Sequence, residues 1–262
     1  VGVEVHRSHD VLVQGNRFER VITGLYALQC TEVRFVGNSA LDIQGRMPRA
    51  HMVQFDKVSG PGNRVTDNLA MNQAATSHPE DVISMFKATG TPDDPILIAR
   101  NTILGDPRLG SEGKSPTGSG IMLGDLGGGW IVCRDNRLFS PAQVGIGIAG
   151  GRDITVEDNV IHGDRSDVSN VGLYAWNQSG EPGGVVTLRG NRVVWINAKG
   201  LSNPYWQGEG FERVDRISND FEMPALPLGD KPTFMQPLIP PSLHGEQPRV
   251  PWPAQNLSPP VG

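Results

Sequence analysis

Apolar and polar residues alternate along most of this chain, and an asparagine recurs at one position of this pattern at intervals of 22 to 35 residues. In every copy, the residue three before the asparagine and the residue two after it are apolar. Alternation with a period of two is typical of a strand with one buried face. The asparagines that occupy this position are Asn16, Asn38, Asn68, Asn101, Asn136, Asn159 and Asn191.

A second alternating stretch lies upstream of each asparagine and often opens with glycine, as in 24–27, 120–123 and 172–175. Each repeat therefore predicts two strands, an asparagine bend and a short third strand. One such unit cannot bury its inner face alone, so successive units must stack. We expect an all-β right-handed parallel β-helix, a solenoid of about seven coils over residues 1–197.

The remaining sequence differs from the repeat. We expect residues 198–222 to form a C-terminal cap or connecting segment. Residues 223–262 contain 11 prolines in 40 positions, which favours an extended tail, and its apolar residues favour packing along the solenoid. Because Val1 lies inside the repeat, we expect upstream sequence or a partner chain at the N-terminal end, with a folded-back tail as the alternative.

Composition and charge narrow the possible partners. With 33 glycines and 21 prolines in 262 residues, turns must be frequent. The net charge is −5 and no basic cluster occurs, which argues against a nucleic-acid partner. No apolar run is long enough to span a membrane. The two cysteines, Cys30 and Cys133, match neither a disulfide framework nor a paired metal motif.

The asparagine repeat resembles the pectate-lyase-like superfamily of parallel β-helix proteins over residues 1–197. That superfamily includes pectate and alginate lyases, polygalacturonases, uronan epimerases, phage tailspikes and proteins without a known reaction. The resemblance implies a groove over the strand that precedes the asparagine strand. It also implies a carbohydrate-active protein, extracellular or periplasmic, with an acidic polysaccharide as partner.

Loop lengths vary most just before that strand, at 42–50, 71–80, 104–119 and 163–170, and variable loops on a regular scaffold are a usual place for a site. Outward polar residues concentrate in the third to fifth coils. The expected patch contains His51, Gln54, Asp56, Lys57, Asp81, Ser84, Lys87 and Asp125. Arg46, Arg49, His78, Glu80 and Lys114 approach it from the loops, and Tyr26, Phe86, Tyr174 and Trp176 offer platforms for sugar rings.

A polysaccharide lyase is the first hypothesis for this patch. Lys87 is the candidate base, because a neighbouring Lys57 should lower its pKa, although Asp125 could instead pair with it. Arg49, His51 or a calcium ion held by Glu80, Asp81 and Asp56 would neutralise the substrate carboxylate. The expected catalytic residues are Lys87, Lys57, Asp81, Asp125, His51 and Arg49. The expected substrate-binding residues are Gln54, Asp56, Ser84, Phe86, Tyr26, Tyr174, Trp176, His78 and Lys114.

Two alternatives stay open. A glycoside hydrolase would use Asp56, Asp81 and Asp125, and two coils separate the outer pair by about 9.6 Å, near the spacing of inverting enzymes. The polygalacturonase motifs are absent, however, and lysine with arginine favours a lyase. A non-catalytic β-helix that binds glycans or builds part of a cell envelope is the other alternative.

Overall fold

The computed structural model describes residues 1–45, 48–106 and 118–222. These residues belong to one compact unit, Val1–Ala225, while the second unit, Leu226–Gly262, lies outside the described residues. The described residues form strands and turns without an α-helix, so none of them forms a helix that could cross a membrane. The prediction for the proline-rich segment 223–262 also falls outside them.

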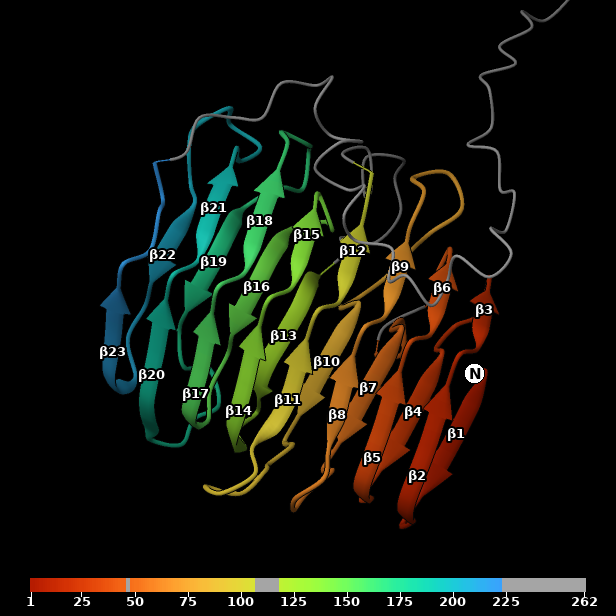
Figure 1. The fold of residues 1–262 in the computed structure, drawn as a ribbon. Coiled ribbons are helices and arrows are strands. Elements are labelled where there is room, and N and C mark those ends of the chain that lie inside the picture. The colour runs from red at the N-terminus through yellow and green to blue at the C-terminus, as the bar shows by residue number, and fades with distance from the viewer. Residues whose placement is uncertain (46–47, 107–117, 223–262) are drawn as a thin grey trace, which may run out of the picture. The chain divides into compact units, whose positions relative to one another are not determined.

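Three parallel sheets run along the solenoid, with 8, 8 and 7 strands (Figure 1). Each of the first seven coils contributes one strand to each sheet, and the eighth coil contributes β22 and β23 to sheets A and B. Sheet A contains β1 (Val3–His6), β4 (Leu25–Leu28), β7 (Val53–Asp56), β10 (Ile83–Phe86), β13 (Ser119–Asp125), β16 (Val144–Ile148), β19 (Val171–Ala175) and β22 (Tyr205–Gln207). Sheet B contains β2 (His9–Gln14), β5 (Thr31–Val36), β8 (Arg64–Thr66), β11 (Ile96–Ala99), β14 (Gly129–Arg134), β17 (Arg152–Glu157), β20 (Gly183–Arg189) and β23 (Phe211–Ile217). Sheet C contains β3 (Arg17–Glu19), β6 (Ser39–Leu41), β9 (Leu69–Met71), β12 (Thr102–Leu104), β15 (Arg137–Phe139), β18 (Val160–Gly163) and β21 (Arg192–Trp195). The prediction of an all-β parallel β-helix is confirmed.

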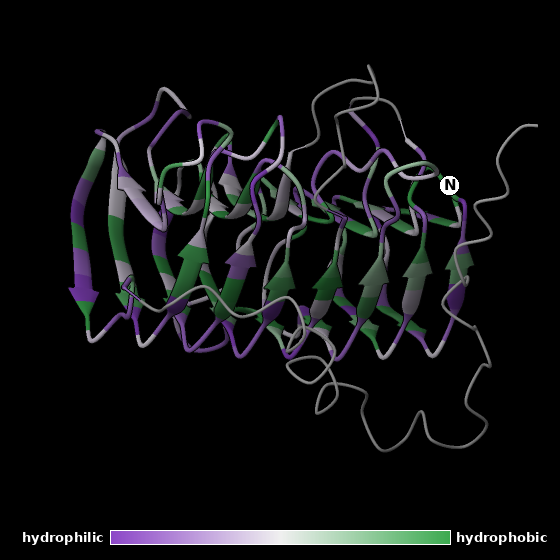
Figure 2. Ribbon diagram, turned by 90° about the horizontal axis from the view of Figure 1, so that it is seen from above, coloured by the Kyte–Doolittle hydropathy of each residue, from purple (hydrophilic) through white to green (hydrophobic). Residues whose placement is uncertain are grey.

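The inward columns read from the sequence become columns of the core. In sheet B, Ile98 pairs with Val65 on one side and Cys133 on the other, and all three side chains are buried. Figure 2 shows apolar stretches repeated from strand to strand along the stack. Burial of these stacked columns removes apolar surface from water in every coil, which is the main stabilisation of a solenoid.

The recurring asparagines form a hydrogen-bonded ladder. The side-chain Nδ2 of Asn101 donates to Oδ1 of Asn136 (2.9 Å) in the next coil and to the carbonyl oxygen of Val65 (2.9 Å) in the preceding coil. The backbone N–H of Asn101 also donates to Oδ1 of Asn136 (3.0 Å). Ladder bonds of this kind run from Asn16 to Asn219, so each buried amide is satisfied by its neighbours.

The solenoid continues past residue 197. Within 198–222, where we expected a cap or connecting segment, β22 and β23 add strands to sheets A and B, and Asn219 extends the ladder. The repeat was hard to recognise here because Arg216 pairs with Leu188 and so takes a position that is apolar in every earlier coil. In this outermost described coil, the guanidinium lies 5.5 Å from the ring centroid of Tyr205.

One irregularity in sheet A affects the site. The pairing of β10 with β13 shifts between Ser84 and Phe86, so that Met122 lies opposite Ser84 and Asp125 lies opposite Phe86. A β-bulge of this type lets two residues oppose one and re-aims the side chains beyond it. Asp125 is therefore opposite Phe86 instead of Lys87, the partner that an uninterrupted alignment would give it.

Candidate functional site

Outward-pointing residues at the start of the sheet A strands are buried in the third to fifth coils. His51, Asp81 and Ser119 occupy the same position in successive coils and are each less than one-tenth exposed. Ring atom Nδ1 of His51 lies 2.6 Å from the carbonyl oxygen of Asp81, and the Ser119 N–H donates to Oδ1 of Asp81 (2.7 Å). Ser119 thus holds the Asp81 carboxyl group, while His51 contacts the backbone of the same residue.

Three carboxyl groups and one imidazole form what we call the carboxyl cluster: His51, Glu80, Asp81 and Asp125. Burial, and then the nearby Asp125, raise the pKa of Asp81 to about 7, although the hydrogen bonds from Ser119 act in the opposite direction. Burial also raises the pKa of Asp125 and that of Glu80. Glu80 Oε2 lies 3.8 Å from Nε2 of His51, whose pKa burial lowers.

The carboxyl cluster has the properties that acid–base chemistry needs. A carboxylic acid that keeps its proton near neutral pH can donate it, and an ionised carboxylate beside it can accept one. Perturbed pKa values of this kind concentrate at functional sites. The cluster combines residues expected as catalytic (His51, Asp81 and Asp125) with a loop residue, Glu80, that we expected as a metal ligand.

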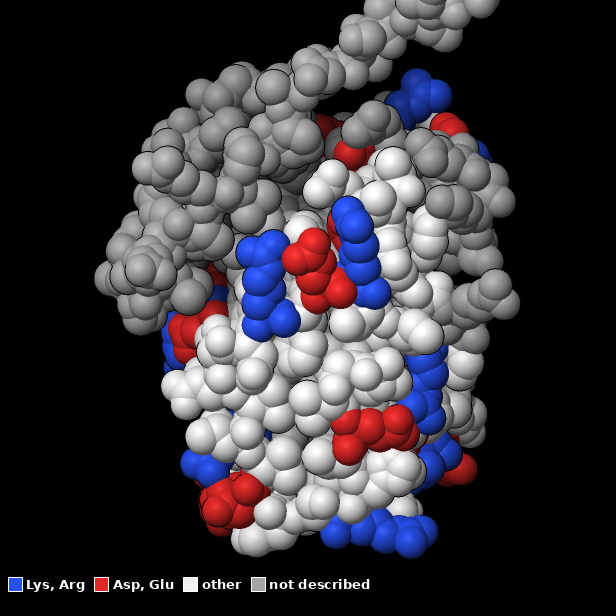
Figure 3. All heavy atoms as spheres, turned by 90° about the vertical axis from the view of Figure 1, so that its right-hand side faces the viewer, with Lys and Arg blue, Asp and Glu red and all other residues white. Residues whose placement is uncertain are grey.

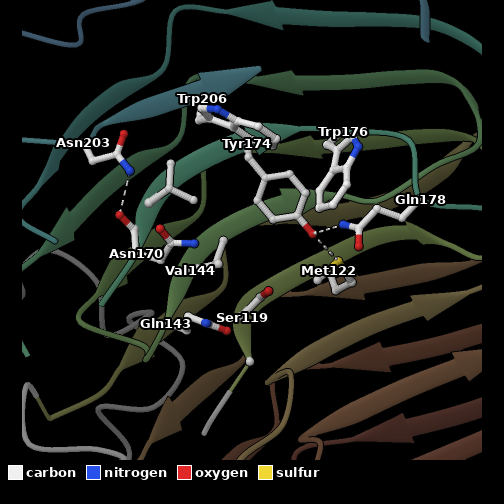
Figure 4. Close-up of a pocket in the computed structure, with 12 residues that line it drawn as sticks. Ser119, Met122, Gln143, Val144, Asn170, Tyr174, Trp176, Gln178, Asn203 and Trp206 are labelled. Atoms are coloured by element: carbon white, nitrogen blue, oxygen red, sulfur yellow. Dashed lines mark hydrogen bonds between the residues drawn. The ribbon is translucent and has the colours of Figure 1, made fainter. Parts of the chain in front are cut away.

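A pocket of about 420 Å³ adjoins the cluster and continues along sheet A toward the eighth coil (Figure 4). We call it the aromatic pocket. Among the described residues, its lining combines three aromatic rings with four amide side chains and contains no charged side chain. The lining residues are Gly118, Ser119, Met122, Gln143, Val144, Asn170, Val171, Tyr174, Trp176, Gln178, Asn203 and Trp206.

The absence of a side chain at Gly147 gives Tyr174 its position. A Cβ atom at residue 147 would lie 2.6 Å from Cε1 of Tyr174, so only glycine lets the ring lie across this strand. The Tyr174 hydroxyl donates to Sδ of Met122 (3.5 Å) and accepts from Nε2 of Gln178 (3.4 Å), as Figure 4 shows. The tyrosine thus bridges three coils of the pocket.

Two tryptophans form the open side of the pocket. Trp176 and Trp206 meet edge to face, with ring centroids 5.5 Å apart and an interplanar angle of 88°. Their exposed fractions are 42% and 45%, unusual for the largest side chain in a protein. Exposed aromatic faces beside hydrogen-bonding groups suit the apolar faces of sugar rings.

The aromatic pocket and the carboxyl cluster meet at Tyr174 and Ser119. Burial raises the pKa of the Tyr174 hydroxyl well above its usual value, and the charges of Asp81 and Asp125 raise it further. Gly118 and Ser119 line the pocket, and Ser119 also holds the Asp81 carboxyl group. The two regions therefore form one continuous site over the third to eighth coils.

Tyr26 lies on the same face, but its ring is already covered. The Arg49 guanidinium lies 3.5 Å from the ring centroid, and the Tyr26 hydroxyl donates to Oδ2 of Asp56 (2.6 Å). Burial and this hydrogen bond raise the pKa of Tyr26 to about 12. Gln54 and Ser84, which follow Tyr26 in the same column, are buried as well.

Lys57 and Lys87 lie at the other end of these strands, at bends with φ of 54° and 51°. Both side chains are exposed, and their Nζ atoms lie 6.0 and 5.9 Å from the ring centroid of Phe86. Lys57 Nζ is 3.4 Å from Oδ1 of Asp56. In the described part of the chain, no ion pair joins Lys87 to Asp125, although the Lys87 N–H donates to the Asp125 carbonyl (2.8 Å).

The expected metal ligands do not converge in the structure. Within residues 1–45, 48–106 and 118–222, no group of three or more His, Cys, Asp or Glu side chains has the geometry to hold a metal ion. His78 lies in the preceding loop, where its N–H donates to the Ile43 carbonyl (2.7 Å). Lys114 and Arg46, expected at the loops, are outside the described residues.

Sequence reasoning identified Tyr174 and Trp176 but missed most of the pocket. The missed residues are Met122, Gln143, Asn170, Gln178, Asn203 and Trp206. Met122 occupies the outward column of Gln54 and Ser84, so its position was predictable from the repeat. Trp206 required recognition of the eighth coil, and the amides lie at positions that depend on the paths of loops.

Comparisons with protein-family models, with curated proteins and with solved structures find no match to this chain.

Proposed function

We propose that this protein binds a polysaccharide along the outer face of sheet A and cleaves its glycosidic bonds by acid–base catalysis. One observation carries the proposal: two carboxyl groups with raised pKa values adjoin an aromatic pocket and meet it at Tyr174. The proposal agrees with the pectate-lyase-like resemblance of the repeat. A polymer substrate of this class is found outside the cytoplasm, so we place the protein in the periplasm or the extracellular space.

In the first scheme, the reaction is hydrolysis. Asp81, with a pKa of about 7, protonates the leaving glycosidic oxygen. Asp125 is only half-buried, more open to water than Asp81, and takes the proton of the attacking water. The glycosidic C–O bond breaks as the water oxygen bonds to the anomeric carbon.

The test is to incubate the protein with a panel of neutral and acidic polysaccharides and to measure new reducing ends. Hydrolysis predicts new reducing ends without absorbance near 235 nm. Asp125→Asn should lower the rate at least 100-fold, because a general base contributes about 10²–10⁴. Asp153→Asn, an exposed aspartate of sheet B, is the matched control and should keep the full rate.

A β-elimination is the second scheme, favoured by the position of Lys87. Its ammonium group approaches the Phe86 ring, which Lys57 also approaches, and its side chain is exposed where a substrate could reach it. Lys87 would remove the proton beside a uronate carboxylate, which Lys57 or Arg49 would neutralise. A C4–C5 double bond then forms as the bond from C4 to the glycosidic oxygen breaks, and the released oxygen takes a proton from water.

Absorbance near 235 nm distinguishes the second scheme from the first, since elimination leaves an unsaturated uronide. Lys87→Met should abolish that signal while the fold remains intact, because the side chain is exposed. Parallel reactions with calcium and with a chelator test whether the rate of elimination depends on a metal ion. Binding without either product would leave the protein as a glycan-binding β-helix, and the absence of binding and cleavage across the panel would refute the proposal.

A further inference from the structure

The lining of the aromatic pocket limits the kind of sugar that fits it. The 12 residues that line it in the described part of the chain include no Asp, Glu, Lys, Arg or His. A uronate bound there would lose its hydration without a cation in compensation, and burial of an unpaired carboxylate is costly. Asp81 and Asp125 lie near enough to raise the pKa of Tyr174, so they would also repel a second negative charge.

The groups that are present suit a neutral sugar. Trp176 and Trp206 offer exposed rings for stacking, while amide side chains provide both donors and acceptors for hydroxyl groups. The amide of Gln143 has no hydrogen bond within the described residues and lines the pocket beside Ser119 (Figure 4). It is therefore available to a ligand. Asn203, by contrast, donates to the Asn170 carbonyl (2.8 Å).

The exposed lysines described on this face lie outside the pocket. Lys57 and Lys87 belong to the third and fourth coils, whereas Tyr174 belongs to the seventh. Three coils separate Lys87 from Tyr174, a distance of about 14 Å along the axis at about 4.8 Å per coil. A carboxylate at the lysines and a sugar in the aromatic pocket are therefore different residues of one polymer.

We propose that the aromatic pocket binds a neutral sugar residue, so that the substrate is a polysaccharide that contains neutral sugars and not a homopolymer of uronic acids. This inference rests on the proposed function and specifies the substrate class of the same site.

The experiment is calorimetric titration, with tryptophan fluorescence as a second readout. The probes are neutral tetra- to hexasaccharides of glucose, mannose, galactose and N-acetylglucosamine, and uronate oligosaccharides of equal length. We expect at least one neutral probe to bind, and Trp206→Ala to weaken its affinity at least tenfold. Trp130→Ala is the matched control, because Trp130 lies in β14 of sheet B, and it should leave the affinity unchanged.

A second variant tests the charge argument directly. Gln143→Lys places a cation in the pocket, so it should weaken neutral probes and strengthen uronate probes at least tenfold. If only uronates bind wild-type protein, and Trp206→Ala binds them equally well, this inference is wrong while the proposed function stands. Neutral binding that Trp206→Ala leaves unchanged also overturns it. If no probe binds and no polysaccharide is cleaved, both proposals fail.

Discussion

Asparagine works in this fold because its amide both donates and accepts at one bend. Asn101 is fully buried, and its Oδ1 accepts from the backbone N–H and the side-chain Nδ2 of Asn68, while its own Nδ2 donates to Val65. Removal of this side chain leaves several buried polar groups without partners, each at a cost of about 1–3 kcal/mol.

Asn101→Ala should therefore lower the free energy of unfolding by about 3 kcal/mol. Urea denaturation followed by circular dichroism measures the change. Asn16→Ala is the matched control, since Asn16 is exposed at the first described rung, and it should cost less than about 1 kcal/mol. Equal losses at both positions would contradict the view that burial makes the ladder stabilising.

Asp81 makes stability depend on pH. Burial raises its pKa from 3.8, the ordinary value for a solvent-exposed aspartate, to about 7 in the fold, so the folded state binds the proton more tightly than the unfolded state. The sign follows from linkage: the contribution is present below the unfolded pKa and is lost as pH rises from about 4 to 7. At most, the shift corresponds to about 4 kcal/mol.

Asp81→Asn should abolish most of this loss, because the amide oxygen can still accept from the Ser119 N–H. Urea midpoints of unfolding at pH 4.5, 5.5, 6.5 and 7.5 provide the measurement. The midpoint of the variant should increase relative to that of the wild type as pH rises. Asp153→Asn serves as the exposed control. A constant difference between wild type and Asp81→Asn across this range would rule out the assigned titration.

At the scale of elements, strands were predictable wherever apolar residues alternate, because stacking buries every second side chain. β23 escaped recognition since Arg216 occupies an inward position. The bulge in β13 was equally hidden, as one extra residue near Gly124 changes the alignment of Asp125 without breaking the alternation. Pocket residues such as Asn170 and Asn203 come from loops, whose paths no short periodicity encodes.

The last described coil should unfold independently of the other coils. Val214 of β23 lies opposite Val186 of β20 and packs on the core, so Val214→Asp puts a carboxylate against apolar side chains. We expect β22 and β23 to lose hydrogen-exchange protection while β10 and β11 keep theirs. Saccharide binding should weaken too, because β22 carries Trp206.

Glu212→Ala, an exposed change in the same strand, is the control for Val214→Asp and should preserve both protection and binding. Loss of protection in every coil at once would show that the solenoid unfolds as a single unit, contrary to this expectation.

At the scale of the molecule, charge is distributed in pairs. The end at which β1 lies shows acidic and basic side chains next to one another instead of one large patch of a single sign (Figure 3). Pairs such as Arg100–Asp67 (2.7 Å) and Arg189–Glu157 (3.2 Å) continue this arrangement along sheet B. Long-range attraction of a polyanion is therefore weak, and recognition depends on local contacts within sheet A.

The asparagine ladder also makes the solenoid a graduated scale. Each rung fixes one coil against the next, so positions on the outer face are separated by whole multiples of about 4.8 Å. The lysines lie at the third and fourth coils of that scale, the carboxyl cluster at the third to fifth, and the aromatic pocket at the fifth to eighth. Insertion or removal of one complete coil would change the length of the outer face by one coil spacing and leave each of these regions intact. Evolution can therefore lengthen or shorten the binding face of such a protein in fixed steps.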